Sequence, residues 1–140
     1  MDKSFKDLRI VDNFYQTSAF FPMPLTLIGT LDENGNTSYG AYSLVFPYYI
    51  AGKDFYAMIL ECRNTSNTCK GLLRYGKCTI NFLPYTKKNF QSHVDLGFPG
   101  DTPEEKMKNF KFHLSDGMSK NDDPNGDYPK VITEALQVFE

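Results

Sequence analysis

The stretch from Pro24 to Pro84 constrains the fold of this chain most, because it alternates apolar β-type runs with turn signals. The runs lie at 25–31, 55–60 and 78–83, and the second is expected to be a buried strand. Asn34-Gly35 follows the first run and favours a hairpin turn, so a return strand is expected over 37–45. Short strands in this order predict a mainly β, barrel-like structure with helical additions.

Two or three short helices are expected beside the strands. A helix over 66–75 is predicted by apolar residues at helical spacing, with Gly76 as its stop. A second is predicted at Thr102, which opens a capping box with proline at the first helical position. A third, amphipathic helix is expected over 5–20, from the spacing of Phe5, Leu8, Val11, Phe14 and Tyr15. The polar stretch 115–129 is expected to be a loop, and 131–139 a strand.

Composition and charge narrow the classes of function. At 140 residues the chain fits one domain with a buried core. The net charge is −2 and no basic block exceeds Lys87-Lys88, so a nucleic-acid partner is not expected. The N-terminus lacks the apolar core of a signal peptide, and no apolar run reaches membrane-spanning length. With three cysteines and no CxxC spacing, these features predict a cytoplasmic protein with reduced thiols and no membrane contact.

Two segments carry residues suited to a bound ligand. Arg63 precedes the run Asn64-Thr65-Ser66-Asn67-Thr68 at the expected start of a helix. A helix N-terminus, hydroxyl groups and an arginine together suit a phosphate group, although an ordinary helix cap beside a surface arginine gives the same pattern. The run Ala41-Tyr42-Ser43-Leu44 at a strand end has backbone groups that can meet the edge of a flat ring, or it is a strand with a core tyrosine.

Other chemistries find less support in the sequence. His93 and His113 stand twenty residues apart, without a cysteine at metal-ligand spacing, so no metal site is expected. Cys62 beside Arg63 is either a thiol with a lowered pKa or, as favoured here, a buried and inert one. The chain has no GxGxxG and no Walker A motif, so neither a Rossmann nor a P-loop nucleotide site is expected.

The order of these segments resembles the flavin reductase-like, FMN-binding split-barrel family over nearly the whole chain. The matching segments are Gly40-Ala41-Tyr42-Ser43, the run from Arg63 to Thr68, Gly76 to Phe82 and Pro129 to Ala135. The resemblance implies an antiparallel split β-barrel of Greek-key type, with residues 1–140 as a single flavin reductase-like domain. It also implies a homodimer with FMN near the subunit boundary. The final hairpin of the family has no counterpart here, so a C-terminally shortened barrel is expected.

The resemblance also implies cofactor-binding residues. Ala41, Tyr42, Ser43 and Leu44 would hold the ring edge of FMN, and Arg63, Ser66, Asn67 and Thr68 would hold its phosphate. The run Ser66-Asn67-Thr68 stands where the family usually has a Lys-Asp-Thr-like triplet, so one basic contact is missing and weaker FMN binding is expected.

The implied activity is that of a flavin reductase, which uses NADH or NADPH and passes hydride from nicotinamide to flavin N5. The cofactor performs this chemistry, so the sequence names no catalytic side chain. Two alternatives stay open. One is a flavin-binding electron carrier or sensor without reductase activity, and the other is a cofactor-free structural relative.

Overall fold

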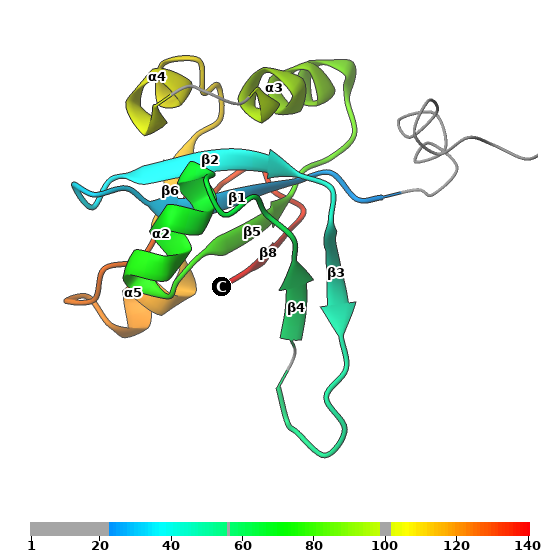
Figure 1. The fold of residues 1–140 in the computed structure, drawn as a ribbon, viewed down its shortest axis with the longest axis vertical. Helices are drawn as coiled ribbons and strands as arrows, with labels where there is room; N and C mark the ends of the chain where they lie inside the picture. Colours follow the sequence, from blue (N-terminus) through cyan, green and yellow to red (C-terminus); the bar gives the residue numbers. More distant parts are fainter. Residues whose placement is uncertain (1–22, 56, 99–101) are drawn as a thin grey trace, which may run out of the picture.

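A four-stranded antiparallel sheet forms the centre of the molecule, in the strand order β2-β1-β5-β8 (Figure 1). Its strands are β1 (Thr26–Leu31), β2 (Thr37–Tyr42), β5 (Thr79–Phe82) and β8 (Gln137–Phe139). The structure is a computed structural model that describes residues 23–55, 57–98 and 102–140. The described part is therefore mainly β, with antiparallel sheets and short helices, as the sequence predicts.

The β1–β2 hairpin confirms the turn expected at Asn34-Gly35. Gly35 has a φ of 78°, a conformation that glycine adopts without strain. The Asp32 carboxylate accepts hydrogen bonds from the amides of Asn34 and Asn36, both at 2.8 Å, and so fixes the loop. The return strand is shorter than predicted and ends at Tyr42, because its partner strand β1 begins at the facing residue, Thr26.

After Tyr42 the chain leaves the central sheet and forms a projecting arm (Figure 1). Strand β3 (Val45–Tyr48) pairs with β4 (Ala57–Leu60) in a separate two-stranded antiparallel sheet. The expectation of a buried strand over 55–60 is wrong, because among the described residues β4 pairs with β3 alone, and its side chains are half-buried or exposed. The exposed apolar side chains of the arm are Phe46, Tyr48, Tyr49, Phe55 and Ile59.

The central sheet separates two apolar clusters. All six residues of β1 are buried, and successive side chains point to opposite faces. Leu27 belongs to the cluster that contains Tyr39 from β2 and Leu96 from a helix. Ile28 belongs to the other cluster, with Val45 at the root of the arm. Because β1 is covered on both faces, its apolar residues do not alternate with exposed polar ones.

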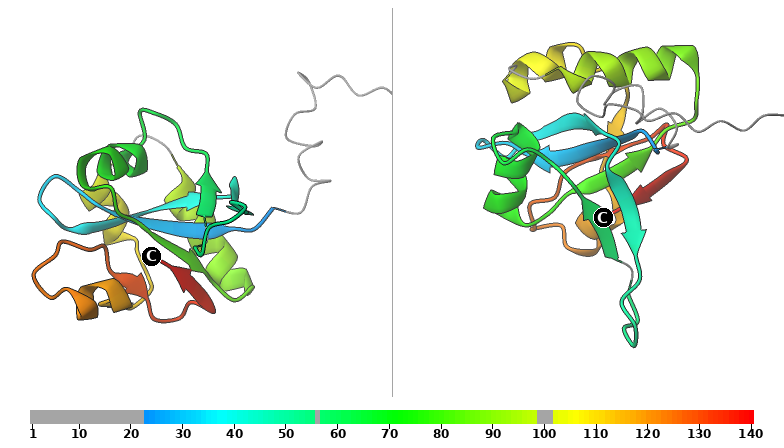
Figure 2. Two further views of the ribbon diagram at one scale, coloured as in Figure 1. Left: turned by 90° about the horizontal axis from the view of Figure 1, so that it is seen from below. Right: turned by 45° about the vertical axis from the view of Figure 1, so that its right-hand side comes forward.

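Four helices occur in the described residues: α2 (Asn67–Tyr75), α3 (Lys87–Gly97), α4 (Pro103–Lys108) and α5 (Met118–Asp122). The prediction of α2 is confirmed, including its stop at Gly76, which has a φ of 65°. The capping box at Thr102 opens α4 as predicted. Helix α3 was not predicted, and the expected helix over 5–20 lies outside the described residues. Helices α3 and α4 cover the sheet over β2, whereas α2 contacts the β1–β2 hairpin (Figure 2).

The C-terminal third is more structured than the sequence indicates. Within the expected loop 115–129 lies the single turn of α5, whose first two amides donate to the Glu140 carboxylate, each at 2.8 Å. The expected strand over 131–139 is split into β7 (Val131–Ile132), which pairs with β6 (Leu114–Ser115), and β8. A turn separates β7 from β8, so the two pair with different strands.

Asn81 joins the C-terminal third to the central sheet. Its side chain is fully buried, and its amide nitrogen donates to Leu27 O and to Thr79 Oγ1, both at 3.1 Å. Its amide oxygen accepts from the backbone N–H of Ile132 at 2.9 Å. One side chain therefore connects β1, β5 and β7 through buried hydrogen bonds.

Candidate functional site

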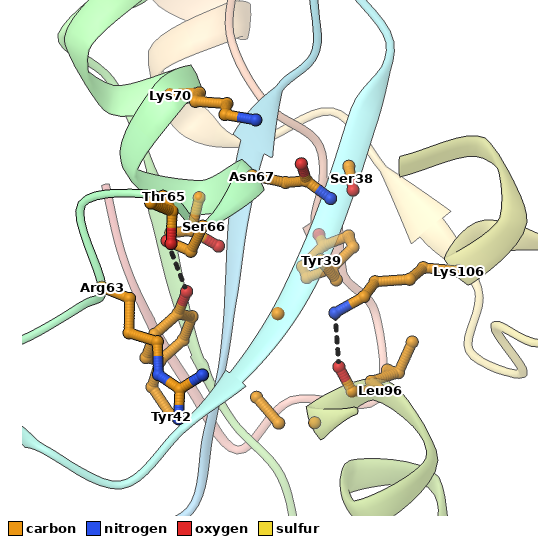
Figure 3. A pocket seen from close by; sticks show the side chains of 14 residues that line it. Ser38, Tyr39, Tyr42, Arg63, Thr65, Ser66, Asn67, Lys70, Leu96 and Lys106 are labelled. Carbon is orange, nitrogen blue, oxygen red and sulfur yellow. Dashed lines mark hydrogen bonds between the residues drawn. The ribbon is translucent and has the colours of Figure 1, made fainter. Parts of the chain in front are cut away.

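A cavity of about 510 Å³ opens between the start of α2, strand β2 and the helices α3 and α4 (Figure 3). Its wall from β2 consists of residues 38–42. A second wall consists of Arg63, residues 65–68 and Lys70. The third comes from the end of α3 and from Lys106 of α4. Segments far apart in the sequence therefore meet at one concave site, with the α2 N-terminus at its edge.

Six of the eight residues that the sequence analysis singled out line this cavity: Ala41, Tyr42, Arg63, Ser66, Asn67 and Thr68. The other two, Ser43 and Leu44, lie outside its lining, because the chain leaves β2 after Tyr42 and turns towards the arm. Leu44 is instead part of the root of the arm, where its carbonyl accepts from the amide of Glu61 at 3.0 Å. The assignment of all eight to a cofactor stays a prediction.

Ser66 caps α2 and also faces the cavity. Its Oγ accepts a hydrogen bond from the amide of Cys69 at 3.1 Å, the usual contact of a helix N-cap. The same Oγ accepts from the phenol of Tyr42 at 3.3 Å, which links the helix start to β2 (Figure 3). Ser66 also makes a side-chain hydrogen bond with Cys62, so its hydroxyl already contacts three protein groups at the edge of the cavity.

Gly40 allows this close approach between strand and helix. A Cβ at Gly40 would lie 2.9 Å from Thr68 Oγ1 and 2.9 Å from the ring of Tyr42. The atoms that approach Gly40 closely are therefore side-chain atoms of Thr68 and Tyr42. The register of β1 and β2 continues through Gly40, so there is no bulge.

The lining is cationic. Arg63, Lys70 and Lys106 all line the cavity, and none of the described lining residues is acidic. The ammonium of Lys106 donates to Leu96 O at 3.1 Å, which holds this half-buried side chain against the end of α3 (Figure 3). The positive end of the α2 dipole adds to the same field, since the first turn of α2 carries no acidic residue. These features favour an anionic group on the ligand.

Sequence reasoning missed Lys70 and Lys106. Lys70 follows Ser66 by four residues, so helical spacing already placed both on one face of the helix. Lys106 comes from a helix far along the chain, and no local spacing connects it to the α2 N-terminus.

Tyr39 gives the cavity a rigid wall. The residue is 2% exposed, its phenol donates to Lys130 O, and its ring stacks on Phe110 with a centroid distance of 4.8 Å. Burial raises the pKa of Tyr39 well above its usual value. The phenol is therefore a neutral structural group and is unsuited to proton transfer near neutral pH.

The cysteines lie outside the cavity lining and are free thiols. Burial, followed by the neighbouring Cys69 thiol, raises the pKa of Cys62, which favours an inert thiol over an activated one. Burial also raises the pKa of Cys78. Within the described residues, no group of three His, Cys, Asp or Glu side chains could hold a metal ion. The same part of the chain contains no helix long and apolar enough to span a bilayer.

No family model matches the sequence, and no curated protein matches it significantly. Solved structures do match. A candidate flavin reductase from Haemophilus somnus 129PT has a TM-score of 0.69 and 13% identity, over 92% of this chain and 72% of that one. The 2-nitrobenzoate 2-nitroreductase of Pseudomonas fluorescens has a TM-score of 0.69 and 17% identity, over 100% of this chain and 64% of that one. Flavoredoxin of Desulfovibrio vulgaris (Miyazaki F) has a TM-score of 0.64 and 15% identity, over 99% of this chain and 76% of that one.

These neighbours are flavin reductase-like split-barrel proteins, so the expected resemblance is confirmed at the level of the fold. The chain spans less than two thirds of the length of the nitroreductase, and more of the other two.

Proposed function

We propose that this chain is an FMN-binding flavoprotein that works as an NAD(P)H-dependent flavin reductase. The observation that carries the proposal is the cavity of about 510 Å³, whose lining combines three cations, a helix N-terminus and no acidic residue among those described. This volume lies in the usual range for small-molecule sites. The likeness of the fold to a candidate flavin reductase and a flavoredoxin supports a flavin rather than another anion.

The phosphate of FMN would lie at the start of α2. Arg63 offers a fork of donors, the hydroxyl of Ser66 faces the cavity, and Asn67 and Thr68 belong to the first turn of α2. Lys70 lines the same wall and adds a cation that the sequence analysis had counted as missing. Two cations therefore flank the proposed phosphate position, which offsets the absence of the Lys-Asp-Thr-like triplet.

The flavin ring would lie along β2, where the backbone of Ala41 and Tyr42 meets its edge. Gly40 lines the cavity without a side chain, and the hydrogen bond from Tyr42 to Ser66 fixes the phenol against the wall. Bound FMN would supply the redox chemistry by accepting hydride at N5 from NADH or NADPH. The side chains bind, orient and shield the reactants, and none needs to act as a nucleophile or base.

The wider proposal includes the assembly. Residues 1–140 would form one flavin reductase-like domain of a cytoplasmic homodimer, and the second copy would cover the exposed apolar arm of β3 and β4. Phe46, Tyr48 and Tyr49 expose 45%, 54% and 82% of their surface on this arm. Such a contiguous apolar surface is typical of an interface.

The test is FMN binding by wild type, Arg63→Ala and a matched control, Arg74→Ala. Arg74 is an exposed arginine in the last turn of α2 and lies outside the cavity lining. We expect the Kd of FMN to rise at least tenfold in Arg63→Ala, about 1.4 kcal/mol for one charge-assisted hydrogen bond, and to stay unchanged in Arg74→Ala. Equal affinities in all three proteins would refute the phosphate position, and a wild type that retains no FMN on desalting would favour the cofactor-free relative.

A second measurement separates reductase from carrier. FMN-loaded protein is mixed with NADH or NADPH without oxygen, and the flavin absorbance near 450 nm is followed. Bleaching supports the reductase, whereas retained FMN that neither nucleotide bleaches supports the electron carrier or sensor.

A further inference from the structure

His93 is a buried histidine with one ring nitrogen unpaired. The residue lies on α3, is 5% exposed, and its Nδ1 is 2.8 Å from Asn89 O. A carbonyl oxygen only accepts hydrogen bonds, so Nδ1 carries the proton and donates it. In the neutral ring Nε2 is then a bare acceptor, and it is buried without a hydrogen-bond partner. Buried polar atoms are rarely left unpaired, so an unpaired one points to a missing donor.

The same histidine lines a second cavity, of about 300 Å³, at the start of α3. The cavity wall is mostly apolar and includes Met23, Leu25, Leu83 and Phe90. Asn89 also lines it, but its side-chain amide already donates to Pro84 O at 2.8 Å. An apolar hollow with a few polar groups is the usual form of a small-molecule site, and this volume is at the small end of the range.

The second cavity is separate from the proposed flavin site. Leu96 and Gly97 line the larger cavity, and His93 lies about one helical turn before them on α3. No described residue lines both cavities. The smaller cavity also contains no cationic side chain among its described lining residues, so it does not suit a phosphate.

We propose that this second cavity binds a small, uncharged, mostly apolar molecule of about one aromatic ring, which donates one hydrogen bond to His93 Nε2. The apolar wall suits the ring, and the unpaired nitrogen suits an O–H or N–H group such as that of a phenol. Nε2 is shielded from solvent, so the proposed molecule reaches it only when side chains of the cavity wall shift.

Phenol and toluene test the proposal, because they are similar in size and only phenol donates a hydrogen bond. Each is titrated into ¹⁵N-labelled full-length protein, and the ring nitrogens of His93 are followed by NMR. We expect saturable phenol binding at least tenfold tighter than that of toluene, with a shift of the Nε2 resonance. The advantage of phenol should vanish in His93→Phe, which keeps a ring and removes the acceptor. Added FMN should not displace phenol.

Three results would overturn the proposal. The first is equal affinity for phenol and toluene in the wild type. The second is an Nε2 resonance that does not shift while phenol saturates its site. This result would also be expected if a trapped water molecule donates a hydrogen bond to Nε2 and phenol does not replace it. The third is competition between phenol and FMN, which would place phenol in the larger cavity. If circular dichroism shows that His93→Phe does not fold, the response of the wild-type Nε2 resonance to phenol tests the proposal without the variant.

Discussion

Gly71 controls how closely α2 packs on the sheet, and its replacement by alanine gives the sharpest test of this packing. A Cβ at this position would lie 2.7 Å from the backbone oxygen of Leu31 and 2.8 Å from Thr30 Cβ. Both atoms belong to the buried strand β1, which cannot move without disturbing both apolar clusters. The helix itself would have to move away, by several tenths of an ångström.

Two opposing contributions decide the sign of the effect. Replacing glycine by alanine inside a helix normally stabilises by about 1 kcal/mol. Overpacking against a buried strand costs about 1 to 3 kcal/mol, and here the upper part of that range applies, because the nearest atom is the Leu31 backbone oxygen, which cannot rotate away. We therefore expect Gly71→Ala to lower the free energy of unfolding by about 1 to 2 kcal/mol, or the urea midpoint by roughly 1 M for an m-value near 1.5 kcal/mol/M. Because α2 carries the proposed phosphate position, FMN affinity should fall as well.

Gly76 supplies the matched control, since it ends the same helix and has nothing within 4 Å of its potential Cβ. Its φ of 65° makes Gly76→Ala cost about 1 kcal/mol through backbone strain alone, and asparagine should recover part of that loss. Neither change at Gly76 should alter FMN affinity. A Gly71→Ala protein that is as stable as the wild type, or more stable, would refute the close packing of α2 on β1.

Three further predictions concern the buried amide, the C-terminal carboxylate and the arm. Asn81→Ala removes three buried hydrogen bonds and should lower the free energy of unfolding by about 3 kcal/mol in urea denaturation, at about 1 kcal/mol each. Partial burial acts to raise the pKa of Glu140, but the hydrogen bonds from α5 outweigh it and hold this pKa below its usual value. The stabilisation from Glu140 is thus present above about pH 4.3 and lost as the pH falls through the lower folded-state pKa. The NMR resonances of the α5 amides should shift with this titration, and the shift should be absent in Glu140→Gln. Tyr49→Ser should weaken the proposed dimer in sedimentation experiments, whereas Leu73→Ser, equally exposed at 82% on α2, should not.

The sequence predicted the elements whose signals are local. The Asn34-Gly35 turn, the stop of α2 at Gly76 and the cap at Thr102 each depend on a few neighbouring residues. Helix α3 was missed because its buried face is formed by Ser92, His93 and Leu96. Two of these three residues are polar, so the sequence does not show the helical spacing of apolar residues that predicts an amphipathic helix. Its position is fixed by packing on β2, which the sequence does not display.

The same distinction applies to the candidate site. The segments around Tyr42 and Ser66 were each recognised from their own sequence, and the structure brings them within hydrogen-bonding distance. Lys106 could not be found in this way, because its place at the cavity depends on how α4 packs beside α3. The exposure of β4 was missed for a related reason, since an apolar run does not reveal that β4 pairs with β3 and with no other strand in the described part of the chain.

The projecting arm should also open independently of the rest of the molecule. An isolated two-stranded hairpin is at best marginally stable, and only its root, at Val45, Met58 and Leu60, packs into an apolar cluster. Amide hydrogens of β3 and β4 should therefore exchange with deuterium much faster than those of β1, through local opening rather than global unfolding. A partner that pairs with the arm would slow this exchange, so the protection of these few amides would report on assembly while the sheet stays unchanged.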